Sequence, residues 1–312
     1  MRPIFLLGAG FTRAVIGDSA PLTHELMKKL DISDFPEMRE DYDRACPDIE
    51  EFLSILDLKI LHFRRNNNLR SDFNHIRENI VQQILNQVAI EALHVDNLAG
   101  HPVLKSFLET VPSKSCILTL NYDCVLDQGL YHTGRWSPFG GYCYSTFPHT
   151  TNENDSKDRI LLLKLHGSCN FRDVEEGQEY FNIEITDKIF PSIYAHINSD
   201  PSDKPHILVM SYIKQFHNGI LSLWRRAISS LKEADKLIIV GCSLREEDSF
   251  LRFALYHFGM KKNTQKFFID IIDKGEDNCK RIKEKIMKVV AYPDRQEVNL
   301  FHDSLEGYLN KT

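Results

Sequence analysis

The sequence predicts an α/β fold, a Rossmann-like parallel sheet with helices on both faces and an inserted helical module. Two observations lead to this prediction. Short apolar runs without polar alternation are typical of buried parallel strands, and they recur along the chain. Segments with helical spacing lie between the last three of these runs, and strands that alternate with helices are typical of an α/β sheet. The apolar runs cover Ile4–Leu7, Cys116–Leu120, Ile160–Leu165, Ile207–Met210, Lys236–Val240 and Phe267–Ile272.

The helical patterns fall into two groups. Ile220–Lys232 and Phe250–Phe258 carry apolar residues at helical spacing between the later strands. Residues 35–110 differ, because they contain no convincing strand and read as amphipathic helices over Ile49–Phe63 and Ile76–Leu93, broken at Asn66–Asn68. We therefore expect one domain over residues 1–312. Its division is predicted as a Rossmann-like core at 1–34 and 111–312 with a helical module at 35–110.

Composition and charge narrow the class of protein. The chain has 312 residues, of which 42% are hydrophobic and 26% charged, as in ordinary globular proteins. No apolar run approaches the roughly 18 residues that a membrane span needs. The apolar start, MRPIFLLGAGF, lacks the length of a signal peptide and reads as a strand. A net charge of −6 without a basic stripe argues against nucleic-acid binding. A cytoplasmic protein that binds neither membranes nor nucleic acids is expected.

The cysteines argue against both disulfides and zinc. Their number is odd and their spacing scattered, so a disulfide framework is not expected. No C-x-x-C pair is present, so a zinc ribbon and other metal sites are not expected either. Reduced thiols fit a cytosolic protein. The seven are Cys46, Cys116, Cys124, Cys143, Cys169, Cys242 and Cys279.

The first candidate motif, Gly8-Ala9-Gly10-Phe11-Thr12, directly follows the first predicted strand. Glycines at such a turn let the backbone approach a pyrophosphate, and the next helix offers its free N–H groups. The full G-x-G-x-x-G fingerprint is not met, since Arg13 stands at its last position. A tight strand–helix turn without a ligand is the alternative.

Two further motifs follow buried strands. Asn121-Tyr122-Asp123 offers an amide and a carboxylate at a strand's carboxyl end, where open α/β sheets bind ligands. Its alternative role is to cap the next helix. His166-Gly167 places a histidine at another strand end, a suitable position for a general base. Its alternative is a structural histidine bonded to a main-chain carbonyl.

The fourth motif, Gly241-Cys242-Ser243, follows the strand at 236–240. Ser243-Leu244-Arg245-Glu246 fits a capping box, so Ser243 is expected to open a helix. A helix start that caps itself can still face a phosphate or a ribose.

In this order the four motifs resemble the sirtuin superfamily. The resemblance covers roughly residues 1–34 and 112–275. Its details are similar to the bacterial sirtuin-like branch of anti-phage defence: Pro21-Leu22-Thr23 with Glu25-Leu26, the Asn-Tyr-Asp form of the second motif, and Asp248 after Gly241-Cys242-Ser243.

The sequence also departs from deacetylase sirtuins. The four zinc-binding cysteines of that group have no counterpart here. Gly17–Pro21 replaces the group's Asp-Phe-Arg loop, and Leu120 stands where many members have glutamine. The resemblance therefore implies that the NAD site is kept while the apparatus for peptide substrates is not.

The resemblance also implies roles for single residues. His166 would accept a hydrogen bond or a proton from a ribose hydroxyl, and Asn121 and Asp123 would orient the nicotinamide ribose or a water molecule. Phe11 would flank the reacting ribose, and Gly241 and Ser243 would contact the adenosine side. The pyrophosphate would be held by Gly8, Ala9, Gly10 and Thr12.

With water as acceptor, the implied reaction converts NAD to ADP-ribose and nicotinamide. The implied context is a toxic effector subunit that depletes NAD in abortive infection, restrained by a regulatory protein or by homo-oligomer formation. Two alternatives stay open at this point. One is an NAD-dependent ADP-ribosyltransferase or deacylase, and the other is a sensor that binds NAD or ADP-ribose without turnover.

Overall fold

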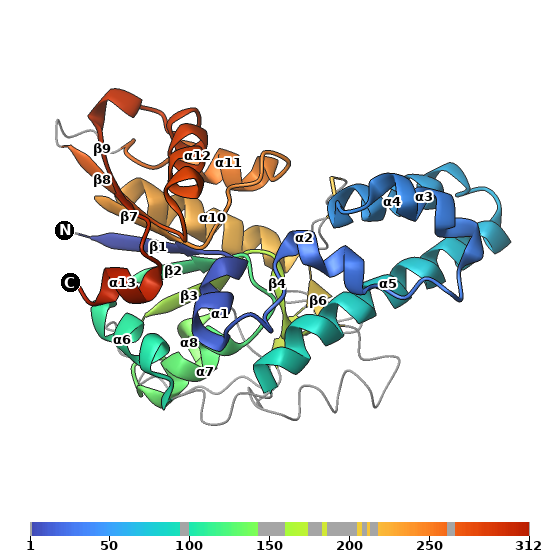
Figure 1. Cartoon of the computed structure of the whole chain (residues 1–312), viewed down its shortest axis with the longest axis horizontal. Coiled ribbons are helices and arrows are strands. Elements are labelled where there is room, and N and C mark those ends of the chain that lie inside the picture. Colours follow the sequence, from blue (N-terminus) through green and yellow to red (C-terminus); the bar gives the residue numbers. More distant parts are fainter. Residues whose placement is uncertain are drawn as a thin grey trace.

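The computed structural model describes residues 2–93, 100–142, 160–173, 183–185, 205–207, 211–212, 218–260 and 266–311. At its centre is a six-stranded sheet in the order β3-β2-β1-β7-β8-β9 (Figure 1). All neighbouring strands of this sheet pair in parallel. The strands are β1 (Pro3–Leu7), β2 (Cys116–Thr119), β3 (Leu161–Lys164), β7 (Lys236–Val240), β8 (Phe267–Ile272) and β9 (Gln296–Phe301). The direction of winding reverses between β1 and β7, so the predicted Rossmann-like α/β fold is confirmed.

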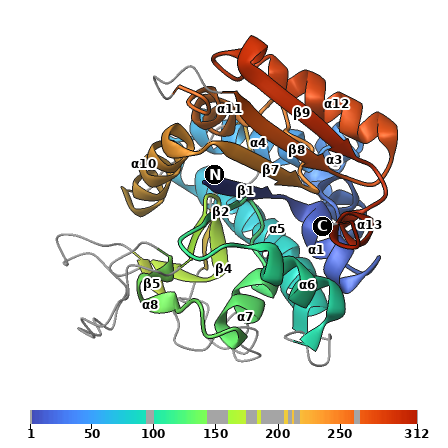
Figure 2. The same ribbon diagram turned by 90° about the vertical axis from the view of Figure 1, so that its left-hand side faces the viewer.

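Helices cover both faces of the sheet (Figure 2). One face carries a group of helices that contact one another: α1 (Ala9–Ile16), α6 (Pro102–Thr110), α7 (Val125–His132) and α13 (Leu305–Leu309). The other face carries α10 (Asn218–Glu233), α11 (Ser249–Tyr256) and α12 (Glu276–Met287). This arrangement follows from right-handed crossovers that run outward from β1 and β7 in opposite directions.

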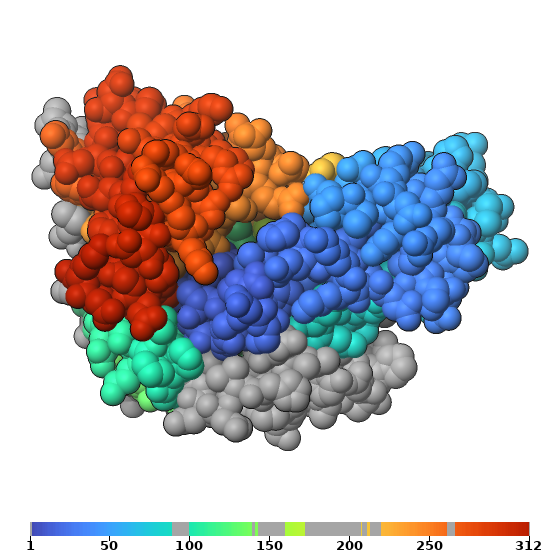
Figure 3. All heavy atoms as spheres, in the orientation of Figure 1, coloured from blue at the N-terminus to red at the C-terminus, as the bar shows by residue number. Residues whose placement is uncertain are grey.

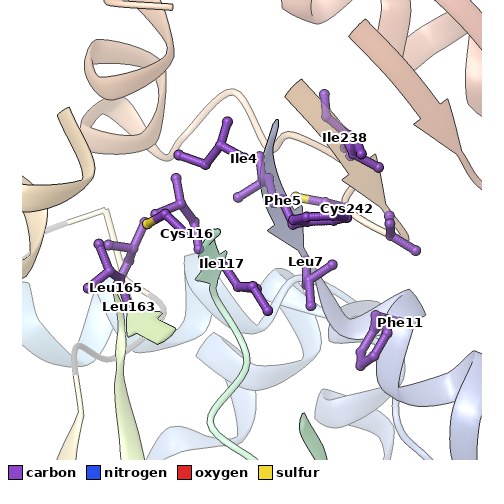
Figure 4. Packing of buried hydrophobic residues seen from close by; sticks show 14 of the residues in the cluster. Ile4, Phe5, Leu7, Phe11, Cys116, Ile117, Leu163, Leu165, Ile238 and Cys242 are labelled. Carbon is purple, nitrogen blue, oxygen red and sulfur yellow. The ribbon is translucent and has the colours of Figure 1, made fainter. Parts of the chain in front are cut away.

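The strands are apolar because side chains on both of their faces are buried. In β1, Ile4, Phe5, Leu6 and Leu7 are each at most 2% exposed. Figure 4 shows Ile4, Phe5 and Leu7 between labelled residues of β2 and β7. Burial of such side chains contributes about 1.5–3 kcal/mol each, which is why central parallel strands read as continuous apolar runs.

Two parts of the strand prediction are corrected. Ile207 does not belong to the parallel sheet. It ends β6 (Pro205–Ile207), which pairs antiparallel with β4 (Gly167–Asp173) in a small sheet that also holds β5 (Ile183–Ile185). Residues 208–210 of that predicted strand lie outside the described residues. The sequence prediction also missed β9, because this edge strand alternates polar and apolar residues.

The helical module has a hydrophobic cluster of its own. Its elements are α2 (Thr23–Leu26), α3 (Arg39–Ala45), α4 (Ile49–His62), α5 (Asn67–Leu93) and the 3₁₀ turns η1 (Met27–Lys29) and η2 (Pro36–Met38). The cluster includes Leu26 and Met27, so module packing begins before residue 35. By contrast, α6 packs on the main core through Leu104 and Phe107. The domain boundaries at 35 and 110 therefore stay a prediction.

Other local details complete the fold. The asparagine run starts α5 rather than merely separating two helices, since the Asn66 side chain accepts a hydrogen bond from the Leu69 amide at 3.3 Å. Two short elements remain, α8 (Pro138–Gly141) and the 3₁₀ turn η4 (Pro293–Arg295). Although α5 spans 27 residues, none of the described helices is long and apolar enough to cross a bilayer.

Candidate functional site

A cleft of about 630 Å³ opens at the carboxyl ends of the central strands. It lies where the winding of the sheet reverses, between β1 and β7, which is the usual ligand position in open α/β sheets. The helical module closes its far side with Glu50 and Val88. In Figure 3 the surface is hollowed between the module and the part of the chain that carries α11. The volume is in the range of small-molecule sites, about 300–1,000 Å³.

The structure brings nine of the ten predicted site residues to this cleft. They are Gly8, Ala9, Gly10, Thr12, Asn121, Asp123, His166, Gly241 and Ser243. Phe11 is the exception, and its prediction is corrected. Its side chain is 1% exposed and belongs to the main core cluster (Figure 4). The centroid of its ring lies 4.9 Å from that of Phe107. Because Phe11 occupies the buried face of α1, it does not flank a ligand in the cleft.

The glycine turns after β1 and β7 pack directly against each other. The Gly10 amide donates to the Gly241 carbonyl at 2.9 Å. A Cβ on Gly10 would lie 2.8 Å from Gly241 Cα, and one on Gly241 would lie 2.4 Å from the Gly10 carbonyl carbon. Gly241 also has a φ of +55°, which favours glycine. Close packing thus explains these glycines without a ligand, while the N-terminus of α1 still faces the cleft.

A chain of hydrogen bonds connects the first two motifs. The Asn121 amide nitrogen donates to the Gly8 carbonyl and to Thr12 Oγ1, both at 2.9 Å. Thr12 Oγ1 in turn donates to Asp123 Oδ2 at 2.7 Å. These bonds fix the orientation of the Asn121 amide and tie the loop after β2 to the glycine turn.

Asp123 is 8% exposed, and both of its carboxylate oxygens accept hydrogen bonds. The second bond comes from the Val125 amide, which donates to Oδ1 at 3.0 Å. Asp123 therefore supports the start of α7 through Oδ1, as the helix-capping alternative predicts. Burial raises the pKa of the Asp123 carboxyl, while Lys164 and the two hydrogen bonds act in the opposite direction. We therefore assign Asp123 to the support of the loop.

A buried lysine stands directly behind this loop. Lys164 at the end of β3 is fully buried, and its Nζ donates to the Asp123 carbonyl oxygen. Nζ also lies 3.2 Å from Asp127 Oδ2, and Asp127 accepts a hydrogen bond from the Tyr142 hydroxyl. This group was not predicted from the sequence, although a lysine inside the apolar run ILLLKL is a signal for a buried charge.

His166 occupies the turn between β3 and β4 and is 7% exposed. Its Nε2 lies 2.8 Å from Asp248 Oδ2, an ion-pair contact that is not aligned as a linear hydrogen bond. Asp248 is 4% exposed and lines the same cleft. The alternative of a histidine bonded to a main-chain carbonyl does not describe this arrangement, because the partner of His166 is a carboxylate.

The predicted capping box at Ser243 is wrong. The helix α11 begins six residues later, at Ser249, and its cap is Asp248, whose Oδ1 accepts from the Leu251 amide at 3.1 Å. Ser243 is exposed at the rim of the cleft, and its carbonyl oxygen accepts from Lys285 Nζ at 3.2 Å. Leu244 has a φ of +48° and keeps residues 243–248 out of a helix.

The helical module contributes a carboxylate that the sequence analysis also missed. Glu50, at the start of α4, is 7% exposed and lines the cleft. Arg245 on the opposite side approaches Glu50 Oε2 at 3.4 Å and Asp48 Oδ2 at 3.0 Å. These ion pairs join the module to the loop between β7 and α11, beside the cleft.

Metal-binding groups and cysteine thiols were also expected or excluded from the sequence. Within the described ranges, no group of three or more His, Cys, Asp or Glu side chains is arranged to hold a metal ion. Six cysteines are free thiols, and Cys143 lies outside the described residues. Burial raises the pKa of the Cys242 thiol, next to the glycine turn, to about 12.

Comparisons with known proteins give only distant structural neighbours. No family model and no curated protein match the chain. A solved complex of a Sir2 homologue with 2′-O-acetyl ADP-ribose matches with a TM-score of 0.46 and 14% identity, over 99% of this chain and 92% of that one. A structure from a study of the mechanism and regulation of Sir2 enzymes gives 0.43 and 13%, over 99% and 89%. A Sir2 complex with a p53 peptide and NAD⁺ gives 0.42 and 13%, over 99% and 91%. Similarity at this level adds no argument about the site, which rests on the contacts described above.

Proposed function

We propose that this protein is an NAD hydrolase that cleaves the nicotinamide–ribose bond to give ADP-ribose and nicotinamide. The observation that supports it most is the convergence of three features on one cleft. These are the glycine turn at the start of α1, the fixed amide of Asn121, and the paired His166. A site for a pyrophosphate and polar groups for a ribose thus lie within one cavity.

In the proposed reaction NAD supplies its own leaving group, since nicotinamide is cationic while attached and neutral once released. The glycine turn and the N-terminus of α1 would hold the pyrophosphate. His166 would take the proton of a ribose hydroxyl as positive charge develops at C1′. The carbonyl oxygen of the Asn121 amide would orient that ribose or the attacking water, because its nitrogen is already bonded to Gly8 and Thr12.

The acceptor separates this proposal from its enzymatic alternatives. Water as acceptor gives hydrolysis, an acyl-lysine gives deacylation, and a protein side chain gives ADP-ribosylation. The missing zinc ribbon favours water, because the sequence keeps no counterpart of the cysteines that flank an acyl-lysine groove in deacetylases. The third alternative, a sensor without turnover, predicts binding but no release of nicotinamide.

The test measures nicotinamide released by the purified chain from NAD alone, with acetylated peptide and carrier protein in parallel reactions. We expect release without either acceptor. His166→Ala should lower the rate on the order of 10²–10⁴-fold, the usual range for a general base. Asn121→Ala should lower it strongly as well, since it also frees the glycine turn. His302→Ala, at an exposed histidine that is not among the residues lining the cleft, is the matched control and should keep the wild-type rate.

Other outcomes of this experiment would indicate a different function. Release that requires acetylated peptide would indicate a deacylase, and label transfer to the carrier protein a transferase. Binding of ADP-ribose without any release would indicate a sensor. A wild-type rate in His166→Ala would remove His166 from the active site.

The cellular role that we propose rests on the resemblance in the sequence. It is a cytoplasmic effector of anti-phage defence that acts with a regulatory protein or as a homo-oligomer. A physiological reason supports restraint, because an unregulated NAD hydrolase would drain its own cell.

A further inference from the structure

We propose that Asp248 is a positioning residue for His166, holding the imidazole in the tautomer that lets its other nitrogen act as a base. This inference rests on the proposed NAD hydrolysis. The two residues come from opposite halves of the sheet, since His166 follows β3 and Asp248 precedes α11. Their contact, 2.8 Å between Nε2 and Oδ2, joins two side chains that line the cleft and are both buried.

The carboxylate of Asp248 is held in place by its second oxygen. Oδ1 accepts the Leu251 amide hydrogen at 3.1 Å and caps α11. The helix presents the positive end of its dipole to the carboxylate, which stabilises the charged form. One oxygen therefore binds the start of the helix, and the other faces the imidazole.

The contact fixes where the imidazole carries its proton. At 2.8 Å a carboxylate oxygen repels the lone pair of an unprotonated ring nitrogen and attracts an N–H, which favours hydrogen on Nε2 even though the two groups are not aligned as a hydrogen bond. Neutral His166 is then protonated on Nε2, and Nδ1 keeps its lone pair. Within the described part of the chain, Nδ1 has no hydrogen-bond partner, so it is the nitrogen available to a ribose hydroxyl. The bent geometry fits an empty site, since catalytic hydrogen bonds often align only when the substrate is bound.

The same contact explains how a positive imidazole would be tolerated after proton transfer. His166 is only 7% exposed, so water solvates its ring poorly. A carboxylate beside Nε2 supplies the compensating charge at the moment the proton arrives. Asp248 takes no proton itself and contacts no substrate atom in this scheme, so its effect acts through His166.

Asp248→Asn separates this role from helix capping. Asparagine caps helices about as well as aspartate, so α11 should be retained. Its NH₂ group, placed against Nε2, requires Nε2 to be the acceptor and moves the ring proton to Nδ1. We expect kcat for nicotinamide release to fall on the order of 10²-fold or more, with KM for NAD nearly unchanged. Asp248→Ser keeps a cap but does not reach the ring, and should also lower kcat.

The matched control is Asp31→Asn, the same change at an aspartate that accepts a hydrogen bond from the Ser33 amide at 2.9 Å. Asp31 is exposed and is not among the residues that line the cleft. Its variant should keep the wild-type kcat and the wild-type histidine spectrum.

A second readout does not depend on activity. The ¹⁵N shifts of the His166 ring, identified by their loss in His166→Ala, report which nitrogen carries hydrogen. We expect Nε2–H in the wild type and Nδ1–H in Asp248→Asn. A spectrum unchanged by Asp248→Asn overturns the inference, and so does a fall in kcat that occurs only together with unfolding of α11. If the wild type releases no nicotinamide but the ring proton still moves from Nε2 to Nδ1 in Asp248→Asn, the proposed hydrolysis is wrong. The role of Asp248 in positioning His166 is then retained.

Discussion

The two sides of the cleft are built on different physics. On one side the turns after β1 and β7 meet backbone to backbone, with Gly10 and Gly241 in contact. On the other side, buried polar groups at the ends of β2 and β3 hold one another through charges and hydrogen bonds, with Lys164 at the centre. The first side is what close packing requires of any strand–helix turn at this spacing. Close packing does not explain the second side, because burying charged groups costs free energy that burying apolar side chains would not cost.

The comparison teaches where functional information lies in this chain. The glycines look like a nucleotide fingerprint, yet packing alone accounts for them. Burying the polar groups costs free energy, and through Asp123 they hold the loop that carries Asn121 at the edge of the cleft. Function is therefore better inferred from the buried polar side than from the glycine motif.

The largest effect on stability is expected at Lys164. Lys164→Met leaves the Asp127 carboxylate buried without its cation, and removing one partner of a buried pair costs about 3–5 kcal/mol. Urea unfolding of the purified variant measures this cost. The double variant Lys164→Met with Asp127→Asn should recover part of it, because no uncompensated charge remains. A single variant as stable as the wild type would show that this side is not held by the ion pair.

On the glycine side, Gly241→Ala is expected to cost about 2–4 kcal/mol, from overpacking against Gly10 and from its positive φ. Gly134→Ala is the matched control, since Gly134 has a φ of +66° but open space where its Cβ would be. It should cost about 1 kcal/mol, the lower end for backbone strain. Equal losses at the two positions would mean that strain, and not the contact between the turns, demands glycine at 241.

What the sequence could predict follows the same division. Strand runs and the residues directly after them are local patterns, so the glycine turns, Asn121 and His166 were placed at one sheet edge in advance. Contacts between distant segments leave no local pattern. Asp248 was read only as part of a motif, because nothing in the sequence shows that residue 248 meets residue 166.

The errors have physical causes of the same kind. Phe11 was expected in the cleft because of its motif, but the helical period turns it onto Phe107. The start of α11 was misplaced because a capping box at Ser243 is plausible locally, whereas Leu244 adopts a positive φ. Glu50 reaches the cleft from a module whose position relative to the sheet no local pattern encodes.

The smallest effect is expected at Asp123, where it depends on pH. Burial raises the pKa of Asp123 in the folded chain above its ordinary value of 3.8, so the folded state holds this proton more tightly than the unfolded state does. The sign follows directly: stability from this group is fully present below pH 3.8 and is lost as pH rises through the folded pKa. Asp123→Asn is neutral throughout, so its free energy of unfolding should gain on that of the wild type as pH rises above 3.8. One unit of difference between the folded and the unfolded pKa is worth about 1.4 kcal/mol. Asp303→Asn provides a control of opposite sign, because Lys311 lowers the pKa of that exposed carboxyl. Urea unfolding at several pH values measures both differences.

If the wild type instead gained on Asp123→Asn as pH rose, the Asp123 carboxylate would be stabilised by Lys164, Thr12 and Val125 more than burial penalises it. The charge pairs on the polar side of the cleft would then stabilise the folded state by more than the desolvation of the Asp123 carboxylate destabilises it.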